Sequence, residues 1–260
     1  MFYALTQGKI PCNGIEIENV LCDIETLNQA AFEGTYDFTA VSVAAYPKVK
    51  KNYLISPVGA SVGDNYGPLV VSQKPLSVSE LKKVKIAIPG LHTSAFLALK
   101  LLLNEFDYEI LPFNKIIPAV LAGKVEAGLI IHEGQLTYLR TKLRKVIDLG
   151  EWWFQKYQLP LPLGVNVMKR TVPQETAKQL ITLLSQSIDY ALKNREEAMR
   201  FALQYSRETP PHLADKFVGM YVNHHTVQMP DEVIKAIELM LHQGYTRGIF
   251  NQPTQAEFLK

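Results

Sequence analysis

The chain has 260 residues, of which 47% are hydrophobic and 20% are charged, and its net charge is +2 at pH 7. These values are typical of a globular protein with a full core, and they exclude disordered and fibrous chains. Because the charges are nearly balanced and spread along the chain, we expect neither a nucleic acid nor a membrane surface as a partner.

The hydrophobic pattern predicts strands and helices that alternate along the chain. This order favours an α/β fold with a largely parallel sheet. Asp23 is expected to cap one helix, and Gly34 and Gly123 to end two. The tail after Gly248 is expected to be loose. The predicted strands lie at 15–22, 38–43, 53–56, 68–72, 84–88, 108–112, 127–131, 146–150 and 160–168. The predicted helices lie at 23–33, 44–49, 77–81, 93–103, 115–122, 174–193, 195–206, 210–223 and 230–245.

Two crossings, near 70–84 and 150–165, divide the predicted strands into two half-sheets. We therefore expect two hinged lobes, with residues 1–83 and 160–260 in the first and residues 84–159 inserted as the second. Ligands of open α/β sheets bind at the carboxyl ends of strands, so the cleft between the lobes is the expected binding site.

The run from Ile86 to Phe96 predicts a strand, a glycine turn and a helix that begins with two hydroxyl residues, Thr93 and Ser94. The first N–H groups of a helix lack partners and the helix dipole is positive there, so this end suits a carboxylate or a phosphate. The alternative is that one of the two hydroxyls only caps the helix.

A second candidate is His132, which an apolar strand at 127–131 delivers at its carboxyl end. Histidine suits proton transfer near neutral pH, so His132 could act as a general base facing the cleft. The alternative is a hydrogen-bonded structural histidine. Glu133 is expected to face away, because neighbours on an extended segment alternate.

Three further positions could contact a ligand. Ser42 lies near a strand end, where it could bind an anion or cap a turn. Gly63 and Gly67 belong to a glycine-spaced loop that could approach a ligand closely, or could simply connect two strands.

Two cysteines, Cys12 and Cys22, match no metal spacing. We therefore expect chemistry without a metal ion or a bound cofactor.

Six runs are spread along nearly the whole chain: 23–28 (DIETLN), 41–46 (VSVAAY), 67–71 (GPLVV), 88–95 (IPGLHTSA), 125–133 (VEAGLIIHE) and 159–164 (LPLPLG). Together and in this order they resemble the 1,4-dihydroxy-6-naphthoate synthase family, an enzyme family of the futalosine route to menaquinone.

The resemblance implies a two-lobed, periplasmic-binding-protein-like (type II) fold in a cytoplasmic enzyme. It implies a carbon–carbon lyase that converts cyclic dehypoxanthine futalosine, a small-molecule carboxylate, to 1,4-dihydroxy-6-naphthoate. His132 would be the general base, Thr93 and Ser94 would hold the carboxylate, and Ser42 with the 63–67 loop would line the other lobe. The alternatives are a non-catalytic small-anion binding protein and chorismate dehydratase. A homodimer is one of the assemblies that the sequence allows.

Family members begin with a strand and a Ser-Pro-Cys-Pro-Asn-Asp-Thr-like loop before a segment that resembles Phe2–Leu5. The printed chain begins at Met1, and we expect it to be less stable and less active than a form extended upstream. Equal melting temperatures and equal turnover of the two forms would refute this expectation.

Overall fold

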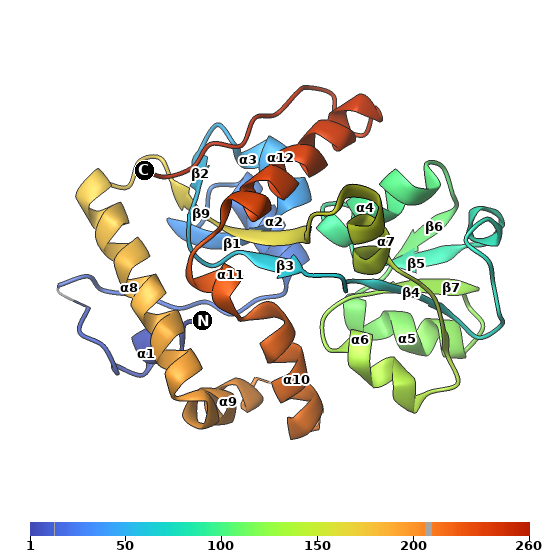
Figure 1. Cartoon of the computed structure of the whole chain (residues 1–260), viewed down its shortest axis with the longest axis horizontal. Helices are drawn as coiled ribbons and strands as arrows, with labels where there is room; N and C mark the ends of the chain where they lie inside the picture. The colour runs from blue at the N-terminus through green and yellow to red at the C-terminus, as the bar shows by residue number, and fades with distance from the viewer. Residues whose placement is uncertain (13, 206–209) are drawn as a thin grey trace.

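The computed structural model describes residues 1–12, 14–205 and 210–260, and it contains two separate β-sheets (Figure 1). The first sheet is built around the long strand β9 (Leu161–Lys169). Strands β1 (Phe38–Ser42), β2 (Tyr53–Ile55) and β3 (Ser61–Gly63) all pair antiparallel with β9. This late strand therefore holds the early strands of the chain together.

The second sheet has the order β6-β5-β7-β4-β8. Strand β5 (Ile86–Ile88) runs parallel to β6 (Tyr108–Ile110) and to β7 (Ala127–Ile130). Strand β4 (Leu69–Ser72) runs antiparallel to β7 and to β8 (Arg144–Asp148). The prediction of a largely parallel sheet is therefore wrong, because β9 and β4 each run against their neighbours.

Strand pairing also moves the predicted boundary between the lobes. Strand β4 precedes residue 84 but lies in the second sheet, so the chain crosses between Gly63 and Leu69. The strand expected at 15–22 does not form. Most side chains of this segment are exposed or half-buried, and it has no strand to pair with.

The helices cover the two sheets and include most of the predicted ones. The described helices are α1 (Tyr3–Thr6), α2 (Ile24–Phe32), η1 (Val43–Ala45), α3 (Tyr46–Val49), η2 (Glu80–Lys83), α4 (Ser94–Leu103), α5 (Phe113–Leu121), α6 (Gly134–Thr137), η3 (Tyr138–Arg140), α7 (Leu149–Tyr157), α8 (Gln174–Lys193), α9 (Arg195–Leu203), α10 (Pro211–Tyr221), α11 (His224–Val227) and α12 (Asp231–Thr246). Asp23 caps α2 as expected, accepting from the N–H groups of Glu25 and Thr26. The sequence does not predict α1, α6, η3, α7 or α11, and the expected helix end at 206 lies outside the described residues.

The C-terminal tail is attached rather than loose. The N–H of Ile55 donates to the carbonyl of Glu257, and the N–H of Leu259 donates to the carbonyl of Ile55, both at 2.8 Å. The Glu257 carboxylate also pairs with Lys50 and Arg170. The tail thus adds a short bridge beside β2.

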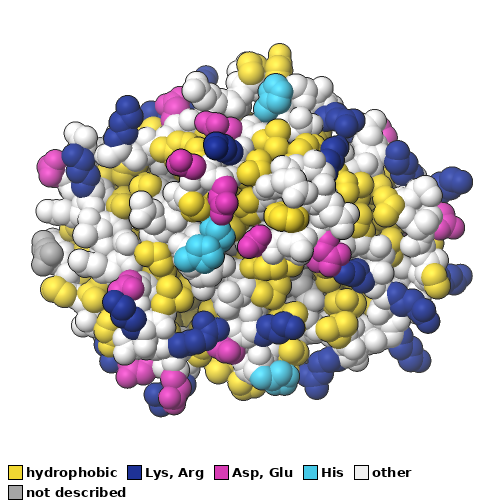
Figure 2. Space-filling model, in the orientation of Figure 1, with side chains coloured by type: hydrophobic (Ala, Val, Ile, Leu, Met, Phe, Trp, Pro, Cys, Tyr) yellow, Lys and Arg dark blue, Asp and Glu magenta, His cyan; other side chains and the backbone are white. Residues whose placement is uncertain are grey.

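The surface and the core agree with the composition. Lysine and arginine side chains are scattered over the face drawn in Figure 2 and mix there with acidic ones. Trp153 is fully buried in the main core against Tyr157, so the Trp152–Trp153 pair serves packing. Among the described residues, no helix combines the length and the apolar character needed to cross a membrane.

Gly150 permits a close approach between the two chain crossings. A Cβ added at Gly150 would lie 1.9 Å from the carbonyl oxygen of Tyr66, and this backbone atom can be displaced only at a cost in free energy. We expect Gly150→Ala to lower the free energy of unfolding by about 3 kcal/mol, the upper range for overpacking. Gly134→Ala is the control, because its Cβ would meet only ordinary contacts at 3.7 Å. Urea denaturation measures both, and equal stabilities would contradict the prediction.

Asp148 connects β8 to α7 and accepts from the N–H groups of Gly150 and Glu151. Burial raises the pKa of this carboxyl from 3.8 to about 6, although those hydrogen bonds oppose the shift. Because the pKa of Asp148 is higher in the folded state than in the unfolded state, protonation of this carboxyl stabilises the folded state. This contribution to the free energy of unfolding is fully present below pH 3.8 and is lost as the pH rises through about 6.

Asp148→Asn keeps a cap acceptor without the charge. We expect the variant to gain stability relative to the parent protein as the pH rises from about 4 to about 7. Urea denaturation of both proteins across this range is the measurement. A stability difference that does not change with pH would show that the buried charge costs nothing.

Candidate functional site

A cavity of about 280 Å³ lies between the two sheets, and we call it the inner hollow. Both lobes line it, because β1 and β9 form one wall while the start of α4 and the end of β7 form another. Helix α10 adds Phe217 and Tyr221. The residues that line it and bear on the site are Ser42, Gly59, Thr93, Ser94, Ala95, His132, Gln135, Gly164, Asn166, Phe217 and Tyr221.

The structure brings together four of the six predicted site residues. Ser42 is the last residue of β1, Thr93, Ser94 and His132 follow the carboxyl ends of β5 and β7, and all four line the inner hollow. Gly63 and Gly67 do not line it. A Cβ at Gly63 would meet the Tyr66 carbonyl at 1.9 Å, and one at Gly67 would meet the N–H of Gly150 at 2.9 Å. These two glycines allow backbone packing, and the ligand contact expected of them stays a prediction.

Helix α4 begins with a hydroxyl cap and a link between the lobes. Thr93 accepts from the N–H of Phe96 (3.2 Å) and donates to the carbonyl of Gly90 (3.0 Å), so it is the N-cap. The Ser94 hydroxyl donates to the carbonyl of Leu163 in β9 (2.6 Å) and accepts from the N–H of Ala44 (3.2 Å). Ser94 therefore ties the start of α4 to the first lobe.

Both hydroxyls donate to backbone carbonyls in this structure, so the carboxylate contact expected of Thr93 and Ser94 stays a prediction. The donors of α4 that have no partner are backbone N–H groups. The cap and the first helical turn use the N–H groups of Phe96 and Leu97. No described residue accepts from the N–H groups of Ser94 and Ala95, two residues that line the inner hollow. Such donors at the positive end of a helix are suited to a carboxylate.

Ser42 is positioned by a residue that sequence reasoning did not single out. The Asn28 side chain accepts from the Ser42 N–H (2.8 Å) and donates to the Ser42 hydroxyl (3.2 Å). Asn28 also donates to the carbonyl of His92 (3.4 Å), which lies just before α4. Ser42 makes no cap hydrogen bond, so a capping role does not explain it.

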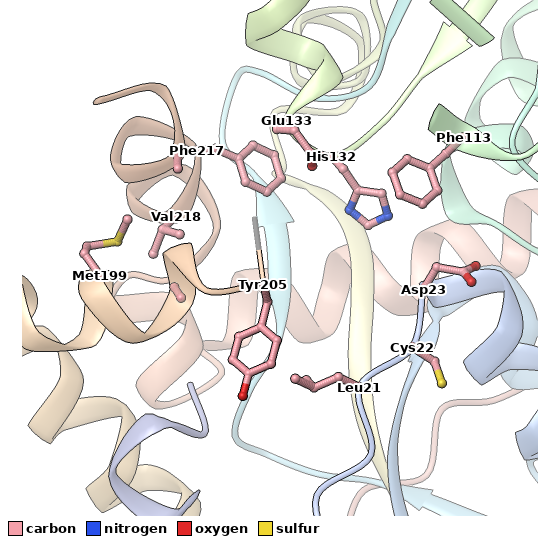
Figure 3. A pocket seen from close by; sticks show the side chains of 12 residues that line it. Leu21, Cys22, Asp23, Phe113, His132, Glu133, Met199, Tyr205, Phe217 and Val218 are labelled. Atoms are coloured by element: carbon pink, nitrogen blue, oxygen red, sulfur yellow. The ribbon is translucent and has the colours of Figure 1, made fainter. Parts of the chain in front are cut away.

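His132 lies where three hollows meet. It lines the inner hollow, a larger outer hollow of about 410 Å³, and a third hollow beside α2. Its backbone has φ 53°, a left-handed value that is uncommon outside glycine and that clusters at functional sites. The imidazole makes an edge contact with the Phe113 ring, with centroids 4.8 Å apart (Figure 3).

Glu133 shares the outer hollow with His132 instead of facing away (Figure 3). The positive φ at His132 ends the extended conformation, and Glu133 is already helical as the residue before α6. Strand alternation therefore does not reach this position. Apolar side chains of α9 and α10, among them Met199 and Phe217, form the opposite wall.

A hydrogen bond joins the lobes on the far side of the inner hollow. The Tyr221 hydroxyl in α10 donates to the Gln135 side chain at the start of α6 (2.7 Å). Burial raises the pKa of Tyr221, so the phenol stays protonated as the donor. The Tyr66 hydroxyl donates to the Met220 carbonyl beside this pair. Together these contacts hold α10 against the inner hollow.

The arrangement can bind an anion and move a proton next to it. The inner hollow has backbone donors at the start of α4, the His132 imidazole and a largely apolar lining. Among the described residues, no three histidine, cysteine, aspartate or glutamate side chains gather as a metal site.

Sequence reasoning missed four residues of the site: Asn28, Gln135, Asn166 and Tyr221. Of these, only Asn166 has a local signal in the sequence, because it is a polar residue in an apolar strand.

Comparisons with known proteins identify the family. Residues 1–246 match the family model described as "Menaquinone biosynthesis". A 1,4-dihydroxy-6-naphthoate synthase of Thermus thermophilus is 36% identical over 249 residues, which cover 96% of this chain and 90% of that protein. A crystal structure of a protein from Archaeoglobus fulgidus is 42% identical, with a TM-score of 0.92 over 96% of this chain and 93% of that one.

A more distant structure identifies the fold. A Candida albicans protein described as having the generic periplasmic binding protein fold is 14% identical, with a TM-score of 0.70 over 100% of this chain and 92% of that one. An identity this low is evidence for the fold alone. The chain therefore has a periplasmic-binding-protein-like α/β fold, and it belongs to the menaquinone biosynthesis family.

Proposed function

We propose that this chain is a 1,4-dihydroxy-6-naphthoate synthase, a lyase that acts on cyclic dehypoxanthine futalosine with His132 as general base. The observation that carries the proposal is that His132 and the unpartnered N–H groups of Ser94 and Ala95 line one cavity between the lobes. The relative from Thermus thermophilus bears the name of this activity and aligns along most of both chains.

The proposed chemistry divides between the two ends of the cavity. The N–H groups of Ser94 and Ala95 hold the substrate carboxylate, and the bicyclic ring fills the apolar space. His132 removes a proton beside a carbonyl, which allows the spiro-fused, sugar-derived part to leave and the bicycle to become aromatic. The outer hollow next to His132 gives the leaving part room, while the Tyr221–Gln135 contact keeps water from the ring.

Two alternatives use the same fold. A non-catalytic small-anion binding protein would use the N–H groups of α4 but would have no need of a histidine at the opening. Chorismate dehydratase acts on another carboxylate of the same pathway. Turnover separates the three, because only the proposed enzyme releases 1,4-dihydroxy-6-naphthoate from cyclic dehypoxanthine futalosine.

Replacing the proposed base tests the assignment directly. His132→Ala should lower kcat by ~10²–10⁴-fold, the usual contribution of a positioned general base. The absorbance of the released naphthoate measures the rate. His242→Ala is the control, because His242 is exposed on α12 and lines none of the three hollows. An His132→Ala variant that turns over like the parent protein would remove His132 from the mechanism.

The anion preference of the inner hollow has its own test. We expect 2-naphthoate to inhibit the enzyme competitively and at least about tenfold more strongly than 2-naphthamide, because backbone donors at a helix N-terminus favour a negative charge. The two compounds share one ring system and differ in charge. Equal inhibition constants would place the carboxylate away from α4.

A further inference from the structure

Asn166 is a buried polar side chain in the inner hollow that has no assigned task. It lies in the middle of β9, where it pairs with Ala40 of β1. The residue is 1% exposed and lines the inner hollow. In the described part of the chain, neither its amide nitrogen nor its amide oxygen has a hydrogen-bond partner.

This state is unusual for a buried asparagine. Buried side-chain amides are hydrogen-bonded in the large majority of structures, because a missing partner leaves the desolvation cost of the group uncompensated. Asn28, also fully buried, follows the rule through its two bonds to Ser42. Asn166 instead lies between Val165 and Val167 in an otherwise apolar strand segment, where a valine or leucine would avoid the cost.

The neighbouring backbone makes room for this amide. Gly59 approaches so closely that an added Cβ would lie 1.9 Å from the Asn166 amide nitrogen, and its φ of 90° suits glycine. The fold therefore accommodates a polar group that no described residue satisfies. Asn166 lines the inner hollow, but its unsatisfied amide nitrogen and oxygen are themselves buried beside the cavity wall, so a ligand reaches them when the side chain rotates toward the hollow.

The position of Asn166 along β9 indicates which part of a ligand it reaches. The Ser94 hydroxyl bonds to the carbonyl of Leu163, three residues earlier on the same strand. Three residues of an extended strand span about 10 Å. A fused bicyclic acid whose carboxylate lies at the start of α4 spans a similar length, so its far ring comes to Asn166.

We propose that Asn166 is a substrate-binding residue whose side-chain amide holds a ring oxygen at the end of the bicycle remote from the carboxylate. This inference rests on the proposed function. The amide nitrogen donates to that oxygen when it is a carbonyl, and the amide oxygen accepts from it when it is a hydroxyl. One side chain can therefore hold the ring oxygen both before and after the bicycle becomes aromatic.

The test compares two ligands that differ in their ring oxygens. Isothermal titration calorimetry under anaerobic conditions measures the binding of two ligands. They are 1,4-dihydroxy-6-naphthoate and 2-naphthoate, which lacks the two hydroxyls. Asn166→Leu should weaken binding of the hydroxylated ligand about tenfold, the effect of one or two lost hydrogen bonds, and leave 2-naphthoate binding unchanged. Asn166→Ala is the second variant, for use if leucine does not fit beside Gly59.

Thermal unfolding of the ligand-free proteins separates binding from structure. Asn166→Leu should keep or raise the Tm, because it removes an unsatisfied group, whereas the matched control Asn28→Leu should lower the Tm by breaking the hydrogen bonds of Asn28 to Ser42 and to the His92 carbonyl. A fall in Tm with Asn166→Leu as large as that with Asn28→Leu would overturn the proposal.

Binding outcomes distinguish this inference from the function on which it rests. If the parent protein binds both ligands and the Asn166 variants lose affinity for neither, or for both equally, the Asn166 assignment is wrong while the proposed function stands. If the parent protein binds neither ligand, the proposed function fails and this inference fails with it.

Discussion

The site depends on one hydroxyl that joins the two lobes. Ser94 begins α4 in the second lobe, and its hydroxyl bonds to the Leu163 carbonyl of β9 and to the Ala44 N–H of η1, both in the first lobe. These bonds fix the positive end of α4 against the long strand that organises the first sheet. The unpartnered N–H groups of Ser94 and Ala95 are thereby held at the cavity that both lobes line.

The other polar groups of the cavity are arranged around this fixed point. Asn28 binds both Ser42 and the His92 carbonyl, so the end of β1 and the approach to α4 share one support. His132 arrives from β7, which pairs with β5, the strand that leads to α4. Tyr221 and Gln135 join the lobes again across the cavity. Anion donors and imidazole therefore keep their separation, which proton transfer in a bound substrate requires.

Local signals in the sequence predicted the parts of this arrangement that depend on neighbouring residues. Asp23 caps the helix that follows it as predicted, Thr93 takes the capping role that the sequence left open between it and Ser94, and the apolar run 127–131 carries His132 to a strand end. These features need only short stretches of chain, because capping and strand burial are encoded within a few residues. The carboxyl-end rule then places Ser42, Thr93 and His132 at one cleft.

The remaining features depend on contacts between distant residues. The spacing of Gly63 and Gly67 could not reveal whether ligand or backbone approaches them, and the structure puts the Tyr66 carbonyl and Gly150 there. The support of Ser42 by Asn28 and the docking of the tail on β2 each require the folded chain. The hydrophobic pattern also could not predict whether neighbouring strands run parallel or antiparallel. A strand that is buried on both faces is a continuous apolar run in either kind of sheet.

A crystal structure of the protein with 1,4-dihydroxy-6-naphthoate tests the central claim most directly. The account predicts the carboxylate at the N–H groups of Ser94 and Ala95, with the ring inside the inner hollow and the His132 imidazole at its edge. A ligand bound in the outer hollow alone, or bound with its carboxylate away from α4, would contradict it.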